Sequence, residues 1–471
     1  MVAIAIFLFW VLAAYGFFSK KPHVLIYILF GTMPLGSFAV IPTVITGGLT
    51  FTATPIVALL IIARVFTARG GLNLFTNIAL SKKHGLFLFA FWVVGIFTTI
   101  FMPRLFSGDV MVVPLRGISL AYAFPLAPSS QNFSQLIYVS ISILSVFAFI
   151  EMFREEKMRQ HAIAAMCLGA TVQVVSGFLD FLNYYLPLDF ILETFRNASY
   201  ALAVDVEIFS SKRVVGLMPE ASAFGNMCVN FLAFIYFFRR ACEDAFLREK
   251  AIPVLIVALI LLVWLSTSSA SYVGLGFLGA MIGFEWMWRA LKDKRNRLLK
   301  QGLMVELWLL NIALICFLTT VLVYPELFDP IIERVDRMVF QKTESYSYIE
   351  RSMWNATAWQ ALLDTYGIGV GLGSARTSNG VVALVSSFGI VGTLFYVLFL
   401  LQVFLRHTTR DDHYGEAFIS ACKWSFLPPF LVDTLIATAA DFGVSNAFRF
   451  GLVLSITYAM YSKNKYANPY N

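Results

Sequence analysis

Charged side chains are scarce in this chain of 471 residues: Asp, Glu, Lys and Arg make up only 13% of it. Soluble domains carry about 25% charged residues, so a soluble protein of this size could not cover its surface with so few. The chain is 59% hydrophobic and contains 46 Phe, which also excludes a disordered chain and a coiled coil. These absences leave a membrane protein.

The chain also has few cysteines and lacks a nucleotide-binding motif of the Walker type. The five cysteines lie in or beside apolar segments, so we expect no disulfide framework. The chain contains no Walker sequence, which argues against a nucleotide-binding enzyme. The net charge of +7 is explained by membrane topology, as argued below, and does not indicate a nucleic-acid partner.

Long apolar segments dominate what is present. At about 20 residues per crossing, they predict an all-α, polytopic integral membrane protein with about 13 (12–14) transmembrane helices and a helical external cap. We treat residues 1–471 as a single integral domain, and we expect the first segment to be a retained span and not a cleaved signal peptide. The predicted spans are Val2–Phe18, Val24–Ile41, Thr50–Phe66, Gly85–Met102, Phe133–Ile150, His161–Phe178, Ser222–Phe238, Ala251–Ser266, Ala270–Trp288, Leu303–Val323, Val381–Leu405, Phe418–Ala439 and Val444–Tyr461.

Lysine and arginine concentrate in alternate connections between these spans. The positive-inside rule makes those connections cytoplasmic, which places the N-terminus outside and the C-terminus in the cytoplasm. Three long external loops follow, at residues 103–132, 179–221 and 324–380. The five histidines all fall on or near the cytoplasmic side. An external catalytic base is therefore a carboxylate, and an external zinc site is not expected.

The loop at residues 179–221 ends in adjacent cations, Lys212 and Arg213, followed by Glu220 where the next span begins. Two interpretations of Glu220 stay open. With Pro219 it would occupy the first turn of a helix and stabilise the helix dipole. Alternatively, it faces a cavity or a cationic partner, because a carboxylate at the bilayer boundary is otherwise costly.

The loop at residues 324–380 has the apolar spacing of two short amphipathic helices, Pro330–Phe340 and Ser347–Tyr366. Arg351 lies in the second and cannot face its neighbour Glu350, so we expect it to serve an external anion. The run Gly367–Gly373 has glycine at every second position. It indicates either a flexible turn re-entering the membrane or a nest of backbone amides that binds an anion.

Two cations fall inside predicted spans, Lys423 and Arg449. An unpaired cation there costs about 2.5–3.5 kcal/mol on insertion scales. Asp433 and Asp441 are the nearby carboxylates that could offset this cost by structural pairing. The functional alternative is that the cations contact a lipid phosphate.

Several motifs carry a resemblance to a known group of proteins. They are Arg351, the glycine run "GIGVGLGS", and then Asn379 followed after nine residues by Gly389 and after two more by Gly392. This pattern resembles the C-terminal module shared by bacterial O-antigen ligases and O-antigen or exopolysaccharide polymerases. The segments "LMPEASAFG", with Glu220, and "STSSASYVGLGFLG", from Ser266, are similar to polymerase segments. The ligase pattern has His where this chain has Ser378, which favours a polymerase over a ligase.

The resemblance implies a membrane-embedded glycosyltransferase (GT-C-like) in the bacterial cytoplasmic (inner) membrane. It would polymerise polyprenyl-pyrophosphate-linked repeat units into O-antigen, capsule or exopolysaccharide, without cofactor or metal. A chain-length regulator and a flippase are the implied protein partners, beside membrane lipids. The implied catalytic residues are Glu220 and Arg351, and the implied pyrophosphate or sugar ligands are Lys212, Arg213, Arg376, Asn379, Tyr346 and Tyr348.

Two rival functions remain open. One is an O-antigen ligase that transfers finished glycan to lipid A core or to protein. The other is a transporter or flippase that moves lipid-linked sugar, or another anion, through a cavity lined by the same arginines. Charged residues spread along a path through several spans would favour transport, whereas most non-cytoplasmic charge in this sequence lies in loops.

Overall fold

The structure is a computed structural model that describes residues 1–42, 45–46, 50–116, 122–199, 202–203, 207–208, 211–291, 296–324, 326, 329, 333, 336, 346–409 and 411–467. Most of these residues are helical, as predicted. In chain order the elements are α1 (Val2–Phe18), α2 (His23–Thr32), α3 (Ala53–Thr67), α4 (Gly71–Ala79), α5 (Leu86–Leu105), β1 (Met111–Val112), β2 (Phe124–Pro125), α6 (Ser130–Met152), α7 (Glu156–Leu182), α8 (Asp189–Phe195), β3 (Glu207–Ile208), β4 (Ser211–Lys212), α9 (Ala221–Phe238), η1 (Arg239–Ala241), η2 (Leu247–Ala251), α10 (Ile252–Leu265), α11 (Ser269–Leu291), α12 (Arg297–Lys300), α13 (Leu303–Val323), α15 (Tyr346–Asp364), α16 (Gly380–Phe404), α17 (His413–Ile436) and α18 (Gly443–Ala467).

Every predicted span coincides with a helix for at least part of its length. The largest difference is α2, which ends at Thr32, after which the chain becomes irregular and Ala39 pairs with Thr52 in an isolated bridge. Among the described residues, five helices are individually long and apolar enough to cross a membrane, or up to six if the bent pair α3 and α4 forms one span. The fold is that of a helical membrane protein, and the number of crossings stays a prediction.

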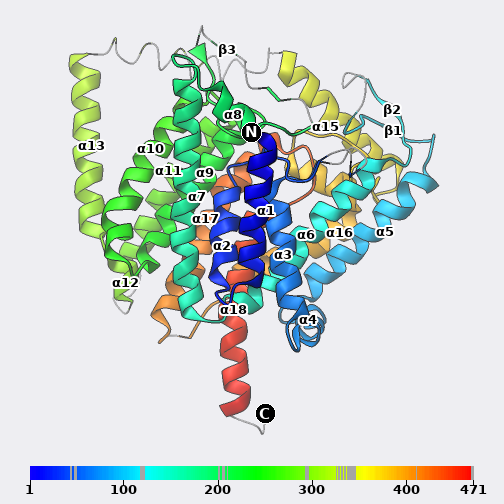
Figure 1. Cartoon of the computed structure of the whole chain (residues 1–471), viewed down its shortest axis with the longest axis horizontal. Helices are drawn as coiled ribbons and strands as arrows, with labels where there is room; N and C mark the ends of the chain where they lie inside the picture. Colours follow the sequence, from blue (N-terminus) through cyan, green and yellow to red (C-terminus); the bar gives the residue numbers. More distant parts are fainter. Residues whose placement is uncertain are drawn as a thin grey trace.

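The long helices run side by side, and their connections gather at two ends (Figure 1). One end carries α8, α15, the N-terminus and the two hairpins, in which β1 pairs with β2 and β3 with β4. The opposite end carries α4, α12 and the C-terminal part of α18. The N-terminus and the C-terminal part of α18 therefore lie at opposite ends of the array. We call the first end the cap end and the second the basic end, after the basic connections predicted there.

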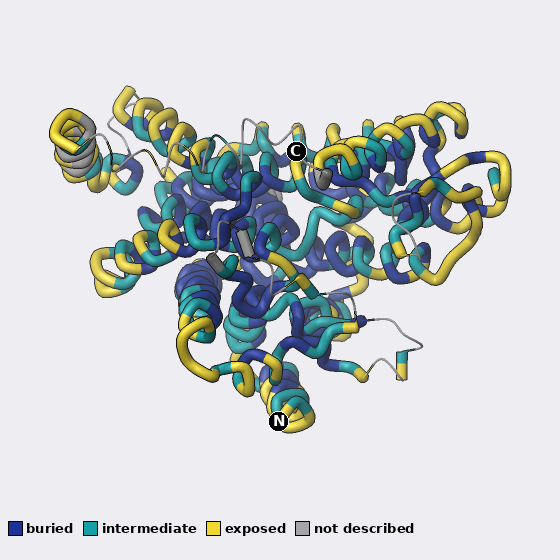
Figure 2. Tube along the Cα trace, turned by 90° about the horizontal axis from the view of Figure 1, so that it is seen from above, coloured by how far each residue is buried: buried dark blue, intermediate teal, exposed yellow. Residues whose placement is uncertain are grey.

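Buried residues fill the middle of the array, and exposed residues lie along its margin (Figure 2). The main core is rich in phenylalanine, for example Phe234 and Phe448, whose ring centroids are 5.8 Å apart. At the margin, α13 exposes large apolar side chains such as Trp308 and Leu322. Apolar side chains that face outward in this way are suited to contact with lipid.

The cap end includes the second amphipathic helix predicted in the loop at residues 324–380. That helix is α15, which confirms the prediction for Ser347–Tyr366 within a few residues. A small separate core, with Val112 of β1, Ala361 of α15 and Val370 of the glycine run, holds it in place. The other predicted helix, Pro330–Phe340, lies outside the described residues except for isolated positions.

At the basic end, four charged side chains form a buried cluster. Glu285 of α11 is paired with Arg240 at 3.0 Å and with Arg289 at 2.9 Å. Glu306 of α13 pairs with the same two arginines. Each charge in this cluster has a partner of opposite sign, as burial in a low dielectric requires.

The glycine run Gly367–Gly373 lies against a break in α16. The break is at Gly389, where φ is 68°, a conformation that favours glycine. The amide of Val370 donates to the carbonyl of Ser386 at 2.8 Å, and the amide of Ile390 donates to the carbonyl of Gly367 at 2.9 Å. The run therefore supplies backbone partners that the interrupted helix has lost.

The hydrogen bonds argue against the anion-nest interpretation of this run, because every amide in it except that of Gly373 donates to an acceptor within the protein. Gly369 donates to the Thr365 hydroxyl at 3.2 Å, and Leu372 donates to the Thr99 hydroxyl at 3.2 Å. Gly371 donates to the carbonyl of Ser387 at 3.2 Å. The alternating glycines instead permit close backbone contact, since a Cβ at Gly371 would meet the backbone of α5.

We expect Gly389→Ala to destabilise the protein by at least about 1–3 kcal/mol, the cost of a positive φ in a residue with a side chain. A Cβ at this position would also collide with the Ile368 carbonyl oxygen. The matched control is Gly276→Ala in α11, where a Cβ would meet nothing within 4 Å. That change should be neutral or stabilising by up to about 1 kcal/mol. Thermal unfolding of the purified variants measures both, and equal midpoints would contradict this account of the break.

Candidate functional site

A cavity of about 1030 Å³ opens among α9, α16, α17 and α18. Glu220 and Arg376 line its polar part, together with Arg116 of the loop at residues 103–132. The other wall is apolar and comes from α16, where Val381, Leu384, Val397 and Leu400 line the cavity. The cavity therefore joins a charged region near the cap end to an apolar surface that follows a helix.

Glu220 is the N-cap of α9, one residue before the first turn in which we expected it. Its carboxylate accepts a hydrogen bond from the Ser222 hydroxyl. It makes no ion pair with a described residue, and its side chain is exposed to the cavity. The position is compatible with both interpretations, because a carboxylate at a helix N-terminus also interacts favourably with the helix dipole.

Arg376 is held in place by contacts that leave part of its guanidinium unused. Its amide donates to the carbonyl of Val113 at 2.7 Å, and its Nη1 donates to the carbonyl of Leu115 at 3.2 Å. The guanidinium carbon lies 4.3 Å from the ring centre of Trp354 in α15. Nε is buried with no hydrogen-bond partner among the described residues. Arg376 is thus a rigidly placed cation of the cavity lining, and its Nη2 makes no hydrogen bond to a described residue.

Arg213 and Arg351 lie near these two residues, although neither lines the cavity. Burial lowers the pKa of Arg213 from its usual range, while Glu220 opposes that shift and Arg351 adds to it. Burial likewise lowers the pKa of Arg376. Glu350 and Glu220 oppose that shift, whereas Arg351 adds to it. The fold therefore brings Arg213, Glu220, Arg351 and Arg376 into one electrostatic neighbourhood from three distant parts of the sequence.

Much of Arg213 is already engaged by the turn between α10 and α11. Its Nε donates to the Thr267 hydroxyl at 3.0 Å, and its Nη2 donates to the Thr267 carbonyl at 3.1 Å. Thr267 has a positive φ of 47°. The serine-rich turn has no basic residue of its own, and Arg213 supplies the cation that contacts it.

Lys212 points away from Arg213 and belongs to a different cluster, centred on Asp180 of α7. Asp180 is buried and pairs with Arg196 at 2.7 Å and with Lys212 at 3.3 Å. Its second oxygen accepts from the amides of Val215 and Gly216 at 2.6 and 3.0 Å. Asp180 therefore fixes the segment that leads to Glu220. A carboxylate two residues after the predicted span His161–Phe178 was the available sequence signal for it, but nothing in the sequence indicated its partners.

The three remaining predicted site residues are less directly placed. Asn379 caps α16, and its side-chain oxygen accepts from the amides of Val381 and Val382. Tyr348 lies on α15 with 42% of its surface exposed. Tyr346 begins α15, but its side chain lies outside the described part of the structure. Neither Asn379 nor Tyr348 is among the described residues that line the cavity.

The polar lining continues into the helix array. Asp433 of α17 accepts from Asn226 of α9 at 2.8 Å, and both line the cavity. Asp441, in the loop between α17 and α18, also lines it. Burial raises the pKa of Asp441 to about 6. Because of this shift, the Asp441 carboxylate, which lines the same cavity as the charged region, changes its protonation close to neutral pH.

Arg449 lies beneath this lining and forms no ion pair with Asp433 or Asp441, although Asp433 is close enough to interact with it electrostatically. Its three nitrogens donate to neutral oxygens, those of Ser425 at 3.1 Å, Asn446 at 2.8 Å and Asn230 at 2.6 Å. No carboxylate of a described residue forms an ion pair with it. Asn230 and Asn446 also line the cavity, so Arg449 orients two of its amide side chains.

Across the described residues, no group of three or more His, Cys, Asp or Glu side chains could hold a metal ion. Metal independence stays a prediction. Comparison with known proteins finds neither a family model nor a curated protein that matches this chain. The resemblance to polysaccharide polymerases therefore depends on the short motifs alone.

We expect Asp180→Asn to destabilise the protein by about 3–5 kcal/mol, because it leaves Arg196 buried without a counter-charge. The matched control is Asp189→Asn, at the start of α8, where the carboxylate is exposed and accepts one bond from Asn183. That change should cost about 1 kcal/mol or less. Thermal unfolding distinguishes them, and similar midpoints would show that the Asp180 cluster does not hold the segment.

Proposed function

We propose that this protein is a polysaccharide polymerase that uses a polyprenyl-pyrophosphate-linked oligosaccharide as glycosyl donor. The observation that carries the proposal is the shape and chemistry of the large cavity. Its charged region contains Arg116, Arg376 and Glu220, and its α16 wall is apolar. A lipid-linked donor has the same division, with an anionic pyrophosphate and sugars at one end and an isoprenoid chain at the other.

The topology prediction adds the side of the membrane. If the basic end faces the cytoplasm, the cavity opens at the outer face of the inner membrane. Lipid-linked repeat units would be joined there, beyond the reach of nucleotides. A catalytic device built from arginines and carboxylates, without a nucleotide or nucleotide-binding motif, suits that compartment.

The reaction is displacement at the anomeric carbon of the donor. The acceptor hydroxyl oxygen forms the new bond to that carbon, while the bond from the carbon to the pyrophosphate oxygen breaks. Polyprenyl pyrophosphate leaves with the bonding electron pair. Arg376 lines the cavity, and its Nη2 is free of described partners and could donate to the charge that develops on the leaving group, with Arg116 and Arg351 nearby.

The hydroxyl proton must pass to a base as the new bond forms. Glu220 is our first choice, because it lines the cavity and has no ion pair among the described residues. Asp441 is the competing carboxylate, since its raised pKa of about 6 suits a base that works near neutral pH. The two candidates make different predictions for variants and for pH.

One observation favours transport of a lipid-linked sugar as a second candidate function. Polar side chains from three helices, Asn226, Asp433 and Asn446, continue the cavity inward, and buried Arg449 lies beside them. A path of this kind suits passage of a polar group through the array. A transporter moves its substrate unchanged, so formation of new glycosidic bonds separates the two functions.

We expect Glu220→Gln to lower polymer formation by about 100-fold or more, because the amide keeps the shape but cannot accept a proton. We expect Arg351→Lys to be impaired by about 100-fold, because it keeps the charge but loses the forked donors. The measurement is polymer formed from lipid-linked repeat units, at matched protein abundance and fold. Glu193→Gln and Arg104→Lys, at exposed positions of the cap end, are the matched controls.

Near-normal polymer from Glu220→Gln would remove Glu220 from the reaction. In that case, two results together would assign the base to Asp441. Asp441→Asn would lose activity, and the wild-type rate would fall as the pH drops through about 6. Normal polymer from Arg351→Lys would reduce Arg351 to a structural role. Translocation of repeat units without polymer, unaffected by either carboxylate variant, would favour transport instead.

A further inference from the structure

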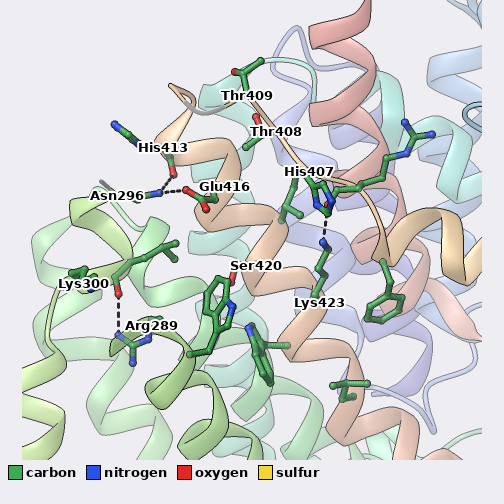
Figure 3. A pocket seen from close by; sticks show the side chains of 17 residues that line it. Arg289, Asn296, Lys300, His407, Thr408, Thr409, His413, Glu416, Ser420 and Lys423 are labelled. Atoms are coloured by element: carbon green, nitrogen blue, oxygen red, sulfur yellow. Dashed lines mark hydrogen bonds between the residues drawn. The ribbon is translucent and has the colours of Figure 1, made fainter. Parts of the chain in front are cut away.

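A second cavity lies at the basic end, on the opposite side of the array from the proposed catalytic site. Its volume is about 740 Å³, and it is enclosed by α11, α12, the end of α16 and the first half of α17 (Figure 3). Neither the motifs nor the proposed reaction accounts for it. The inference below does not depend on the proposed function.

Basic side chains outnumber acidic ones in its described lining. Lys300, Arg406 and Lys423 line it, together with His407 and His413, whereas Glu416 is the one carboxylate among the described lining residues. Arg289 also lines it, but Glu285 and Glu306 offset its charge. The cavity therefore carries an excess of positive charge before any ligand enters.

Lys423 lies on α17, well inside the ends of the helix. Figure 3 shows its side chain extending along the helix toward the segment that contains His407. Its ammonium donates to the Arg406 carbonyl at 2.7 Å, and an ammonium has three donors in all. Burial lowers the pKa of Arg406, and no described carboxylate forms an ion pair with it. Arg406 would therefore gain from an anion in the cavity.

Glu416, the carboxylate of this lining, contacts Asn296 at the edge of the cavity. Its carboxylate accepts from the Asn296 amide at 2.9 Å, and the same amide donates to the His413 carbonyl at 3.0 Å (Figure 3). This contact ties α12 to the start of α17 at the edge of the cavity. Nδ1 of His413 is buried without a partner among the described residues.

The remaining wall is apolar and aromatic. Trp288 and Trp424 lie with ring centres 6.4 Å apart, and Phe404 and Leu427 complete the lining on that side. Tryptophan is enriched at the boundary between lipid and water, where one part of its ring is apolar and one part wet. The cavity thus combines cations with an apolar surface in the way that a phosphate headgroup with attached hydrocarbon requires.

We propose that this cavity binds a phosphate group, supplied by the headgroup of an anionic phospholipid. Basic pockets between membrane helices on the cytoplasmic side are suited to such headgroups. Free phosphate offers the same charge and acceptor oxygens without the hydrocarbon, so the experiment must separate the two sources. Lys423 is the residue most directly involved, since its ammonium lies between α17 and the end of α16.

The test uses the full chain, purified in a neutral detergent, and follows thermal unfolding as ligand is added. A ligand that binds the folded state raises the midpoint in proportion to its occupancy. The ligands are a short-chain phosphatidylglycerol, a phosphatidylcholine with the same chains, and inorganic phosphate. The variants are Lys423→Gln, Lys423→Arg, and Lys157→Gln, which makes the same charge change in the first turn of α7, outside the cavity.

We expect phosphatidylglycerol to stabilise the wild type and Lys157→Gln, with affinity about tenfold weaker in Lys423→Gln and largely restored in Lys423→Arg. Stabilisation by inorganic phosphate with the same dependence on Lys423 would support the site and assign it to a soluble phosphate. If Lys423→Gln does not fold, Lys300→Gln takes its place. Equal responses of the cavity variant and Lys157→Gln would overturn the proposal, as would equal responses of the wild type to phosphatidylglycerol and phosphatidylcholine without a Lys423-dependent response to inorganic phosphate.

Discussion

The close approach of two backbone segments, the glycine run and the broken turn of α16, is the constraint on which the cap end depends. Gly369 and Gly389 lie so near each other that a Cβ on either would strike backbone atoms. This contact fixes where the run ends, and Arg376 follows three residues after Gly373. It also fixes the start of α16, whose apolar face lines the cavity. The position of the charged Arg376 side chain thus depends on glycines, which have no side chain, at Gly369 and Gly389.

Ion pairing distinguishes the charged side chains that stabilise the fold from those that could bind a ligand. In a low dielectric an ion without a partner costs several kcal/mol, and most buried ions in the described structure have partners. Asp180 has Arg196 and Lys212, and Glu285 has Arg240 and Arg289. By contrast, Glu220 and Arg376 have no ion pair among the described residues, yet both line the same cavity. That contrast, more than any single motif, distinguishes the candidate site from the surrounding scaffold.

Sequence patterns predicted the helices well, because hydrophobic length and spacing are local properties. The predicted spans coincide with helices, and Ser347–Tyr366 coincides with α15. Side-chain partners were less predictable, since they depend on which distant segments pack together. Lys212 and Arg213 are neighbours in sequence, but Asp180 and Thr267 draw them to different clusters. Arg449 has amide and hydroxyl partners that no charge pattern could have indicated.

The central claim is that the protein forms glycosidic bonds from lipid-linked repeat units. The most direct measurement is the length of the glycan attached to the polyprenyl carrier in cells that lack the protein. A polymerase predicts accumulation of single repeat units on the carrier at the outer face of the membrane, reversed when the wild-type chain is restored. Accumulation of long polymers on the carrier would indicate a ligase, and single units confined to the inner face would indicate a transporter. Either of the last two results would contradict the account.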